Sequence, residues 1–146
     1  GGGGAGGGGG VALFVCGEID CREGLPNALA KNKYPTMEAA VEATVGKYIE
    51  GLERASKKHG VSFLVLSVCP PFNPQYGTRI LATRLFNGEL RKRLGDRFVD
   101  ISEQVSSPVG VVREEFGCDG THLGSRAVPL IEAGVNRALE ATGLKV

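Results

Sequence analysis

The sequence predicts an α/β fold: a three-layer α/β/α sandwich with a parallel sheet. Two observations carry this prediction. Short, continuous apolar runs, which are typical of strands buried on both faces, alternate with longer segments that have the apolar periodicity of helices. The resulting order of strand, helix, strand, helix, strand, loop and helix implies right-handed crossovers, which make the strands parallel and place helices on both faces of the sheet.

The folded part begins with a strand and a long helix. Residues 11–16 form a continuous apolar run that ends at Gly17, so we expect a strand that is buried on both faces. Between Pro35 and Gly60, apolar residues recur at three- and four-residue steps, which predicts an amphipathic helix. Thr36 is suited to cap the first turn of this helix, basic residues occupy its last turn, and Gly60 ends it.

Two further strands and two helices follow. Residues 61–68 predict a second buried strand, which a cysteine and a proline pair end. We expect a second helix that ends at Gly95, a short third strand over residues 97–101, and a last helix over residues 125–143. The apolar residues expected to line the second helix are Ile80, Leu81, Leu85 and Leu94, and those expected to line the last helix are Val128, Ile131, Val135 and Leu139.

Composition and charge exclude several classes of function. With 146 residues, of which 42% are hydrophobic and 23% charged, the chain has the composition of one soluble globular domain. The net charge is +1 and no stretch combines clustered Lys and Arg with aromatic residues, so we expect no nucleic-acid partner. The longest apolar runs are far shorter than the roughly 20 residues that span a bilayer, so we expect no membrane span. The compartment is nearly unreadable, with the cytoplasm as the default expectation.

The cysteines and the glycines give no sign of a metal or cofactor. Cys16, Cys21, Cys69 and Cys118 show no CxxC spacing and no neighbouring histidines, so we expect no metal and take them as reduced, small buried hydrophobes. A disulfide among Cys16, Cys69 and Cys118 is left open, because sequence alone does not decide pairing.

Residues 1–10 are nine glycines and one alanine, and they form a unit separate from the domain of residues 11–146. A nucleotide-binding loop is rejected, because no strand precedes the tract and no Lys-Ser or Lys-Thr follows it. Three interpretations remain: a flexible linker, a low-complexity tract, or main chain whose residue identities are unassigned. We favour the last, because a near-pure glycine run that leads directly into a buried strand is otherwise hard to explain.

The most informative short segment lies ahead of the last helix, where Asp119 precedes His122 by three residues. A carboxylate that accepts the ring N–H of a histidine fixes its tautomer, so that the other ring nitrogen can take a proton from a hydroxyl. This is how a hydrolase holds its general base, although Asp-Gly is also ordinary turn chemistry. Because sites form at the carboxyl ends of parallel strands, we expect residues 17–22, 69–76 and 119–122 to converge.

In this order, the residues resemble the SGNH, or GDSL-type, hydrolase superfamily. Gly17-Glu18-Ile19-Asp20 is similar to its Gly-x-Asn-Asp block, and Asp119 to His122 matches its Asp-x-x-His block before the final helix. The proline pair after the second strand, and Asn87 with Leu90 in the next helix, also sit where the family places them. The resemblance covers residues 11–146, about the C-terminal two thirds of such a flavodoxin-like domain, so the domain is incomplete at its N-terminus.

The resemblance implies a hydrolase that cleaves acyl or acetyl esters by Ser-His-Asp chemistry without a cofactor. Its substrate would be a small-molecule or glycan ester. By the same resemblance His122 is the general base, Asp119 its orienting partner, and Gly17 an oxyanion donor through its neighbouring backbone. Asp20 and Arg22 would belong to the oxyanion and substrate-binding region.

Two departures from the family pattern matter. The family's Gly-Asp-Ser block is absent, and none of the seven serines has that context, so the nucleophile would lie upstream of this chain. The preceding strands are absent as well, which leaves an unpaired sheet edge unless another segment or chain supplies them.

The second departure is Ile19, which stands where the family's asparagine donates to the oxyanion, a loss that typically costs about 3–4 kcal/mol of transition-state stabilisation. The carboxylate of Asp20 cannot replace that donor, whereas Arg22 is close enough to reach the site or to form a salt bridge with Asp20.

Two alternatives remain open. One is a catalytically inactive SGNH-like module that acts as a structural or binding component in a larger assembly, with protein partners. The other is a flavodoxin-like ligand-binding domain, which shares the sheet order but has no need of Asp119 and His122 close together.

Overall fold

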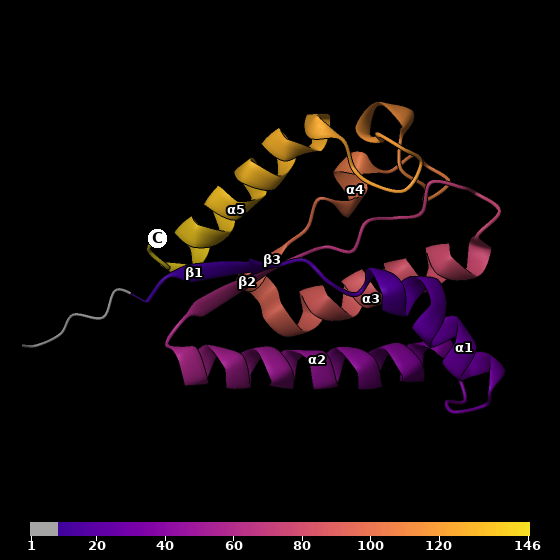
Figure 1. Ribbon diagram of the computed structural model, residues 1–146, viewed down its shortest axis with the longest axis horizontal. Helices are drawn as coiled ribbons and strands as arrows, with labels where there is room; N and C mark the ends of the chain where they lie inside the picture. Colours follow the sequence, from indigo (N-terminus) through magenta and orange to yellow (C-terminus); the bar gives the residue numbers. More distant parts are fainter. Residues whose placement is uncertain (1–8) are drawn as a thin grey trace, which may run out of the picture.

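A computed structural model describes residues 9–146, and the predicted three-layer α/β/α architecture is confirmed. Figure 1 shows a central sheet with α1, α2 and α3 on one side and α5 on the other. The sheet is parallel with strand order β1-β2-β3, and its register pairs Val11 with Ser62 and Val65 with Phe98. The strands are β1 (Val11–Phe14), β2 (Ser62–Leu66) and β3 (Phe98–Val99). The hypotheses about the glycine tract fall on residues 1–8, which lie outside the described residues.

The longest helix, α2 (Met37–His59), begins and ends where the sequence predicts. The Thr36 side chain accepts a hydrogen bond from the Ala39 amide at 3.1 Å, and Gly60 ends the helix in the left-handed conformation with φ 63°. Its buried face packs against the sheet, and the shorter α1 (Leu25–Ala30) packs on α2 and α3 in the same hydrophobic cluster. The buried residues of α2 are Met37, Ala40, Val41, Val45, Ile49 and Leu52.

The next helix, α3 (Gly77–Leu94), buries a different face from the predicted one. The apolar stripe expected from the sequence is only half-buried, whereas Phe86, Asn87 and Leu90 are buried. Asn87 faces inward because its amide donates to the Val68 carbonyl at 2.9 Å and its oxygen accepts from the Val68 N–H at 2.8 Å. A polar side chain thus helps to set the orientation of α3, which a count of apolar residues does not reveal.

The opposite layer consists of α5 (Val128–Thr142), which follows a short α4 (Ser102–Val105) and a long loop. Gly134 lets α5 approach the sheet, because a Cβ there would lie 2.7 Å from Val99 Cγ1. The expected packing of Ile131, Val135 and Leu139 on the sheet is confirmed. Val128 is 56% exposed instead, because it stands in the first turn of α5, which Figure 1 shows away from the sheet.

The prediction that the first strand is buried on both faces is wrong. Leu13 is 38% exposed and Val15 is 67% exposed. Within residues 9–146, β1 pairs only with β2, and α5 packs mainly on β2 and β3. The first strand therefore occupies an edge that its apolar composition does not suit. In the same part of the chain, the structure contains no helix with the length and apolarity needed to cross a membrane.

Candidate active site

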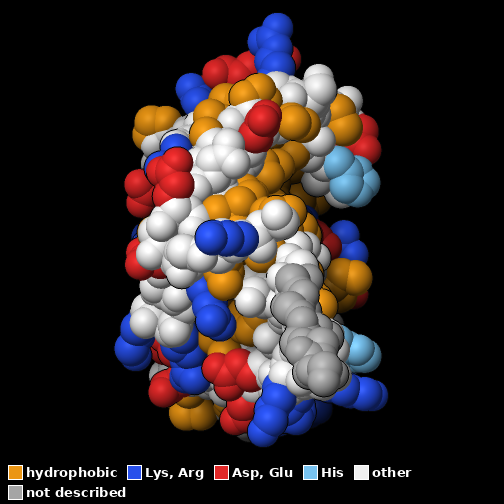
Figure 2. All heavy atoms as spheres, turned by 90° about the vertical axis from the view of Figure 1, so that its left-hand side faces the viewer, with side chains coloured by type: hydrophobic (Ala, Val, Ile, Leu, Met, Phe, Trp, Pro, Cys, Tyr) orange, Lys and Arg blue, Asp and Glu red, His pale blue; other side chains and the backbone are white. Residues whose placement is uncertain are grey.

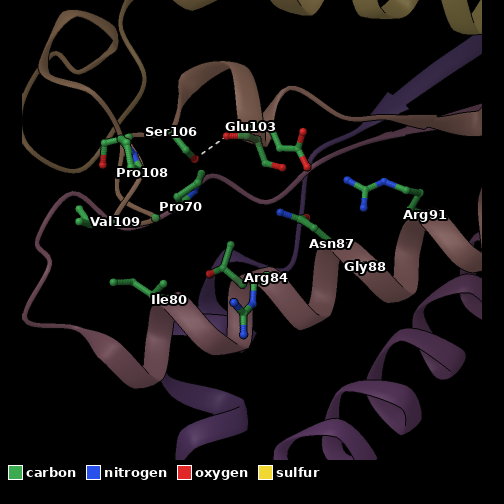
Figure 3. Close-up of a pocket in the computed structure, with 14 residues that line it drawn as sticks. Pro70, Ile80, Arg84, Asn87, Gly88, Arg91, Glu103, Ser106, Pro108 and Val109 are labelled. Atoms are coloured by element: carbon green, nitrogen blue, oxygen red, sulfur yellow. Dashed lines mark hydrogen bonds between the residues drawn. The ribbon is translucent and has the colours of Figure 1, made fainter.

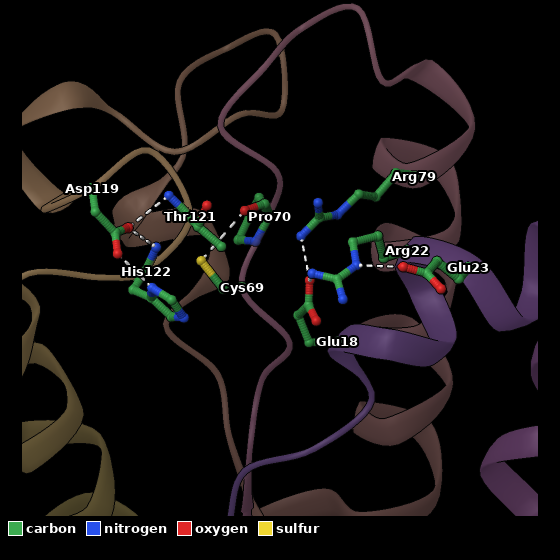
Figure 4. Close-up of polar contacts among 9 residues, drawn as sticks. All are labelled: Glu18, Arg22, Glu23, Cys69, Pro70, Arg79, Asp119, Thr121 and His122. Atoms are coloured by element: carbon green, nitrogen blue, oxygen red, sulfur yellow. Dashed lines mark hydrogen bonds and ion pairs between the residues drawn. The ribbon is translucent and has the colours of Figure 1, made fainter.

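Asp119 and His122 form a hydrogen-bonded pair in the loop before α5. Asp119 Oδ2 lies 2.7 Å from His122 Nδ1. Figure 4 shows the two side chains facing each other. The other carboxylate oxygen accepts the backbone N–H groups of Thr121 at 2.9 Å and of His122 at 2.7 Å. Gly120 allows the tight turn between them with φ +77°. One short segment therefore holds both side chains in a fixed relative position.

These hydrogen bonds set the protonation of the pair. The side-chain contact with His122 and the two backbone N–H donors hold the pKa of Asp119 well below its usual range. An ionised carboxylate only accepts, so Nδ1 is the ring nitrogen that carries a proton, and in the neutral ring the lone pair of Nε2 is free. The His122 side chain is 73% exposed. The pair can therefore take a proton at Nε2 from a group that approaches from outside the loop.

The loop that carries the pair is closed by backbone contacts. The Cys118 N–H donates to the His122 carbonyl at 3.1 Å, and the Gly124 N–H donates to the Phe116 carbonyl at 2.7 Å. Gly117 lies so close to a neighbouring ring that a Cβ there would be 2.8 Å from Phe72 Cε1. The turn is thus anchored at its base, although its tip is exposed.

Gly17 follows β1 and has no room for a side chain. A Cβ at this position would lie 2.7 Å from Phe86 Cε1 and 2.9 Å from Val68 Cγ2, and its φ is +99°. The Gly17 carbonyl accepts the Cys21 N–H at 3.0 Å, which leads the chain into a π-helical turn (Asp20–Gly24). π-Helical turns are rare in proteins, and those that occur often lie at functional sites. The backbone after β1 is therefore held in a conformation that only glycine adopts easily.

The charged residues after β1 pair differently from the expectation. The salt bridge between Asp20 and Arg22, one of the two interpretations of these residues, is absent from the described residues: Arg22 lies 3.4 Å from Glu18 and 3.2 Å from Glu23. Asp20 is exposed instead at the start of the π-helical turn. Figure 4 shows the Arg22 side chain between the carboxylates of Glu18 and Glu23.

Sequence reasoning missed Arg79, in the first turn of α3. Its guanidinium donates to Glu18 Oε1 at 2.6 Å, and its side chain is only 15% exposed. In Figure 4 this pair and the Asp119–His122 pair lie on either side of Cys69 and Pro70. The sequence offered one weak indication of this role, because Arg79 directly follows the loop between the second strand and the second helix.

Contacts link the three segments in pairs: Gly17 after β1 lies against Val68 after β2, and Gly117 in the loop before α5 lies against Phe72. Ile19, which stands where the resembled family has an amide donor, is 62% exposed and brings no polar group. In the described part of the chain, no serine, threonine or cysteine side chain forms a hydrogen bond with the His122 ring. Among residues 9–146, no hydroxyl or thiol is therefore hydrogen-bonded to the His122 ring as the nucleophile of a triad would be.

The four cysteines are free, and none is placed as an activated nucleophile. Burial raises the pKa of the Cys69 thiol to about 11, and the thiol donates to the Pro70 carbonyl at 3.3 Å. Burial, with a smaller contribution from the Asp20 charge, raises the pKa of Cys16 to about 11 as well. The expectation that the cysteines are buried holds fully for Cys21 alone: Cys16 and Cys69 are half-buried, and Cys118 is exposed.

None of the cavities found among the described residues is lined by Asp119 or His122, and two of them are close to other polar side chains. One of about 320 Å³ lies between α3 and the segment around α4, and Figure 3 shows Arg84, Asn87 and Glu103 along it. The other, of about 420 Å³, lies between Arg22 and Arg79. Among residues 9–146, no three His, Cys, Asp or Glu side chains are grouped as metal ligands would be.

No protein-family model and no curated protein matches the chain. One solved structure has a similar fold, that of a protein from Streptococcus pneumonia provisionally named a platelet activating factor. The two share 15% sequence identity with a TM-score of 0.55 over 88% of this chain. This chain spans 59% of the length of that protein. At this identity the likeness concerns the fold.

Proposed function

We propose that this chain is part of a hydrolase domain of the SGNH type, which cleaves acyl or acetyl esters with His122 as general base. The observation that carries the proposal is the 2.7 Å contact between Asp119 Oδ2 and His122 Nδ1, at the end of a parallel sheet where such sites form. The similar fold of a larger solved structure supports it further. The serine nucleophile lies in a part of the polypeptide outside residues 9–146.

Each step of this chemistry assigns a proton to a stated atom. Nε2 of His122 takes the proton of the serine hydroxyl as its oxygen attacks the ester carbonyl. The Asp119 carboxylate stabilises the imidazolium that results. The imidazolium then gives this proton to the leaving alkoxide, and an acyl-enzyme remains. A water molecule attacks in the same way, which releases the acid and restores the serine.

The oxyanion would form near Gly17, whose tightly fixed backbone follows β1. Ile19 has no side-chain amide to donate there, so we propose that backbone N–H groups carry most of the stabilisation. Glu18, which directly follows Gly17, forms ion pairs with Arg22 and with Arg79. Within this proposal they shape the substrate-binding side, together with Asp20.

A fluorophosphonate probe tests the proposal directly. The native polypeptide is treated with the probe, and labelled residues are mapped by mass spectrometry. We expect one labelled serine, and a loss of at least about 100-fold in labelling rate for His122→Ala. His59→Ala is the matched control, because His59 is the other histidine and stands at the far end of α2. Absence of labelling in a folded protein contradicts the proposal.

A second candidate function is supported by one observation. Ile19, exposed at 62%, replaces the donor that the resembled family uses, which fits a catalytically inactive module that binds protein partners in a larger assembly. Fluorophosphonate labelling distinguishes the active esterase from the inactive module. A folded native polypeptide without a reactive serine supports the inactive module.

A further inference from the structure

The cavity of about 320 Å³ lies between one side of α3 and the segment that follows β3. Figure 3 shows Arg84 and Arg91 of α3 along one wall and Glu103 on the other. Its volume is within the range of pockets that hold small organic molecules. No residue of the Asp119–His122 turn lines it, so a molecule bound here would be separate from the proposed ester chemistry.

Two charged side chains of this cavity have no charged partner within residues 9–146. In this part of the chain, neither Arg84 nor Glu103 forms an ion pair. Arg91, which also lines the cavity, pairs with Asp100. On the face that Figure 2 shows, basic and acidic side chains are intermingled. The cavity instead has one cation and one anion that are not paired with each other, and a ligand that carries both charges would pair with each.

The hydroxyl of Ser107 is not used by the fold either. The Ser107 N–H donates to the Val111 carbonyl at 2.8 Å, and the Ser107 carbonyl accepts the Gly110 N–H at 2.9 Å, so the backbone alone sets its position. Its Oγ is buried and has no hydrogen-bond partner among the described residues. A buried hydroxyl without a partner is destabilising. Because Ser107 lines the cavity, a ligand oxygen can accept its proton.

Gly88 leaves the cavity open as far as the backbone of α3. It stands inside the helix, where glycine is less favourable than alanine. A Cβ at Gly88 would meet nothing within 4 Å, so close packing does not explain this glycine, as it does explain Gly134. Gly88 lies four residues after Arg84 and three before Arg91, on the same side of the helix. The glycine therefore makes room between the two arginines.

Much of the remaining wall is apolar. Pro70, Ile80 and Val109 line the cavity, and Val109 is 65% exposed. Gly110, with φ +82°, brings its turn against Ile80, because a Cβ there would lie 3.0 Å from Ile80 Cγ2. A short aliphatic skeleton would cover these side chains and remove apolar surface from water.

We propose that this cavity binds a small aliphatic amino acid, whose carboxylate pairs with Arg84 and whose ammonium group pairs with Glu103. Guanidinium and carboxylate groups form strong, charge-assisted hydrogen bonds. An ammonium group only donates, which suits the Glu103 carboxylate. A ligand with a single charge leaves one of these two side chains unpaired. The Ser107 hydroxyl donates to an oxygen of the ligand.

An NMR titration of the protein tests the inference. The probes are glycine, β-alanine and γ-aminobutyrate, each compared with the acid that lacks the amine: acetate, propionate and butyrate. We expect saturable shifts of the Gly88 and Ser107 amide signals, with a Kd of about 1 mM for the best amino acid. The matched acid should bind at least about 10-fold more weakly. Equal binding of both members of every pair, or no saturable shift with any amino acid, overturns the proposal.

Variants of the two charged side chains assign the ends of the ligand. Arg84→Gln and Glu103→Gln should each weaken binding of the best amino acid at least about 10-fold. Glu103→Gln should also remove the preference for the amino acid over its matched acid. Arg126→Gln and Glu140→Gln are the matched controls, because both residues are exposed and line none of the described cavities. Unchanged affinity in either cavity variant overturns the proposal.

Filling the cavity gives a readout that does not depend on charge. Gly88→Leu should remove the saturable shifts and raise the Tm by roughly 2–4 °C, because leucine is the better helix former. Gly51→Leu is the matched control, since Gly51 lies inside α2 and lines none of the described cavities. A folded Gly88→Leu protein that binds as tightly as wild type contradicts the proposal. Circular dichroism shows whether the variant is folded, and the charge variants test the site if it is not.

Discussion

Asp119 Oδ2 and His122 Nδ1 lie 2.7 Å apart within one turn whose backbone N–H groups are bound by the other oxygen of the same carboxylate. The carboxylate therefore has two tasks, since it shapes the turn and orients the ring. Substitutions can separate these tasks, because an amide oxygen still accepts backbone hydrogen bonds but carries no charge.

Asp119→Asn should leave the turn in place and remove the charge that stabilises the imidazolium. If the proposed chemistry holds, kcat for an acetyl ester falls on the order of 10⁴-fold, because the ring is then held in the wrong tautomer. Steady-state kinetics of the native polypeptide with p-nitrophenyl acetate measure this. Circular dichroism must show an unchanged fold, and a loss below about 10-fold would mean that the pair is not catalytic.

The stability of the protein should depend on Asp119 in acid. The pKa of this carboxyl is lower in the folded state than in the unfolded chain, so its contribution is present above about pH 4 and is lost as the pH falls through the folded pKa. The stability difference between wild type and Asp119→Asn should therefore shrink on acidification. Urea midpoints from pH 6 to pH 2 measure it, and a difference that grows toward low pH contradicts the assignment.

Gly17→Ala should destabilise the protein by about 2–4 kcal/mol, because the new methyl meets Phe86 and Val68 and the backbone has a positive φ. Gly60→Ala is the matched comparison. Gly60 also has a positive φ, of +63°, but has nothing within 4 Å of a Cβ, so a loss of only about 1 kcal/mol is expected. Urea unfolding of both variants compares them, and equal losses would show that the contact with Phe86 is unimportant.

The cysteines should react with iodoacetamide in an order set by exposure and by pKa. Cys118 is exposed and should react first, whereas burial raises the pKa of Cys16 and Cys69 to about 11 and that of Cys21 to about 12. At pH 8 these three thiols are mostly protonated. Mass spectrometry at successive times gives the order of alkylation. Rapid alkylation of Cys69 would contradict the raised pKa and make Cys69 a candidate nucleophile.

Features that depend on neighbouring residues in the sequence could be predicted. The ends of α2 follow from Thr36 and Gly60, and the contact of Asp119 with His122 follows from their spacing in one turn. These features need no knowledge of the rest of the fold, because capping and turn geometry are local.

Features that depend on residues far apart in the chain could not be predicted from the sequence. Glu18 and Arg79 are 61 residues apart in the chain, and no pattern in the sequence joins them. The exposure of Leu13 and Val15 depends on which strand stands beside β1, whereas their apolar character predicts only that they suit burial. The inward face of α3 was missed because two hydrogen bonds of an amide set it.

The bonds between Asn87 and Val68 also limit how α3 can move. Apolar side chains tolerate a small rotation or sliding of a helix, but a donor and an acceptor aimed at one peptide unit do not. The side chain of Asn87 therefore fixes the position of α3 along its axis relative to the end of β2. Arg79 lies on the same helix, about two turns away, so the same two hydrogen bonds also fix where its guanidinium contacts Glu18.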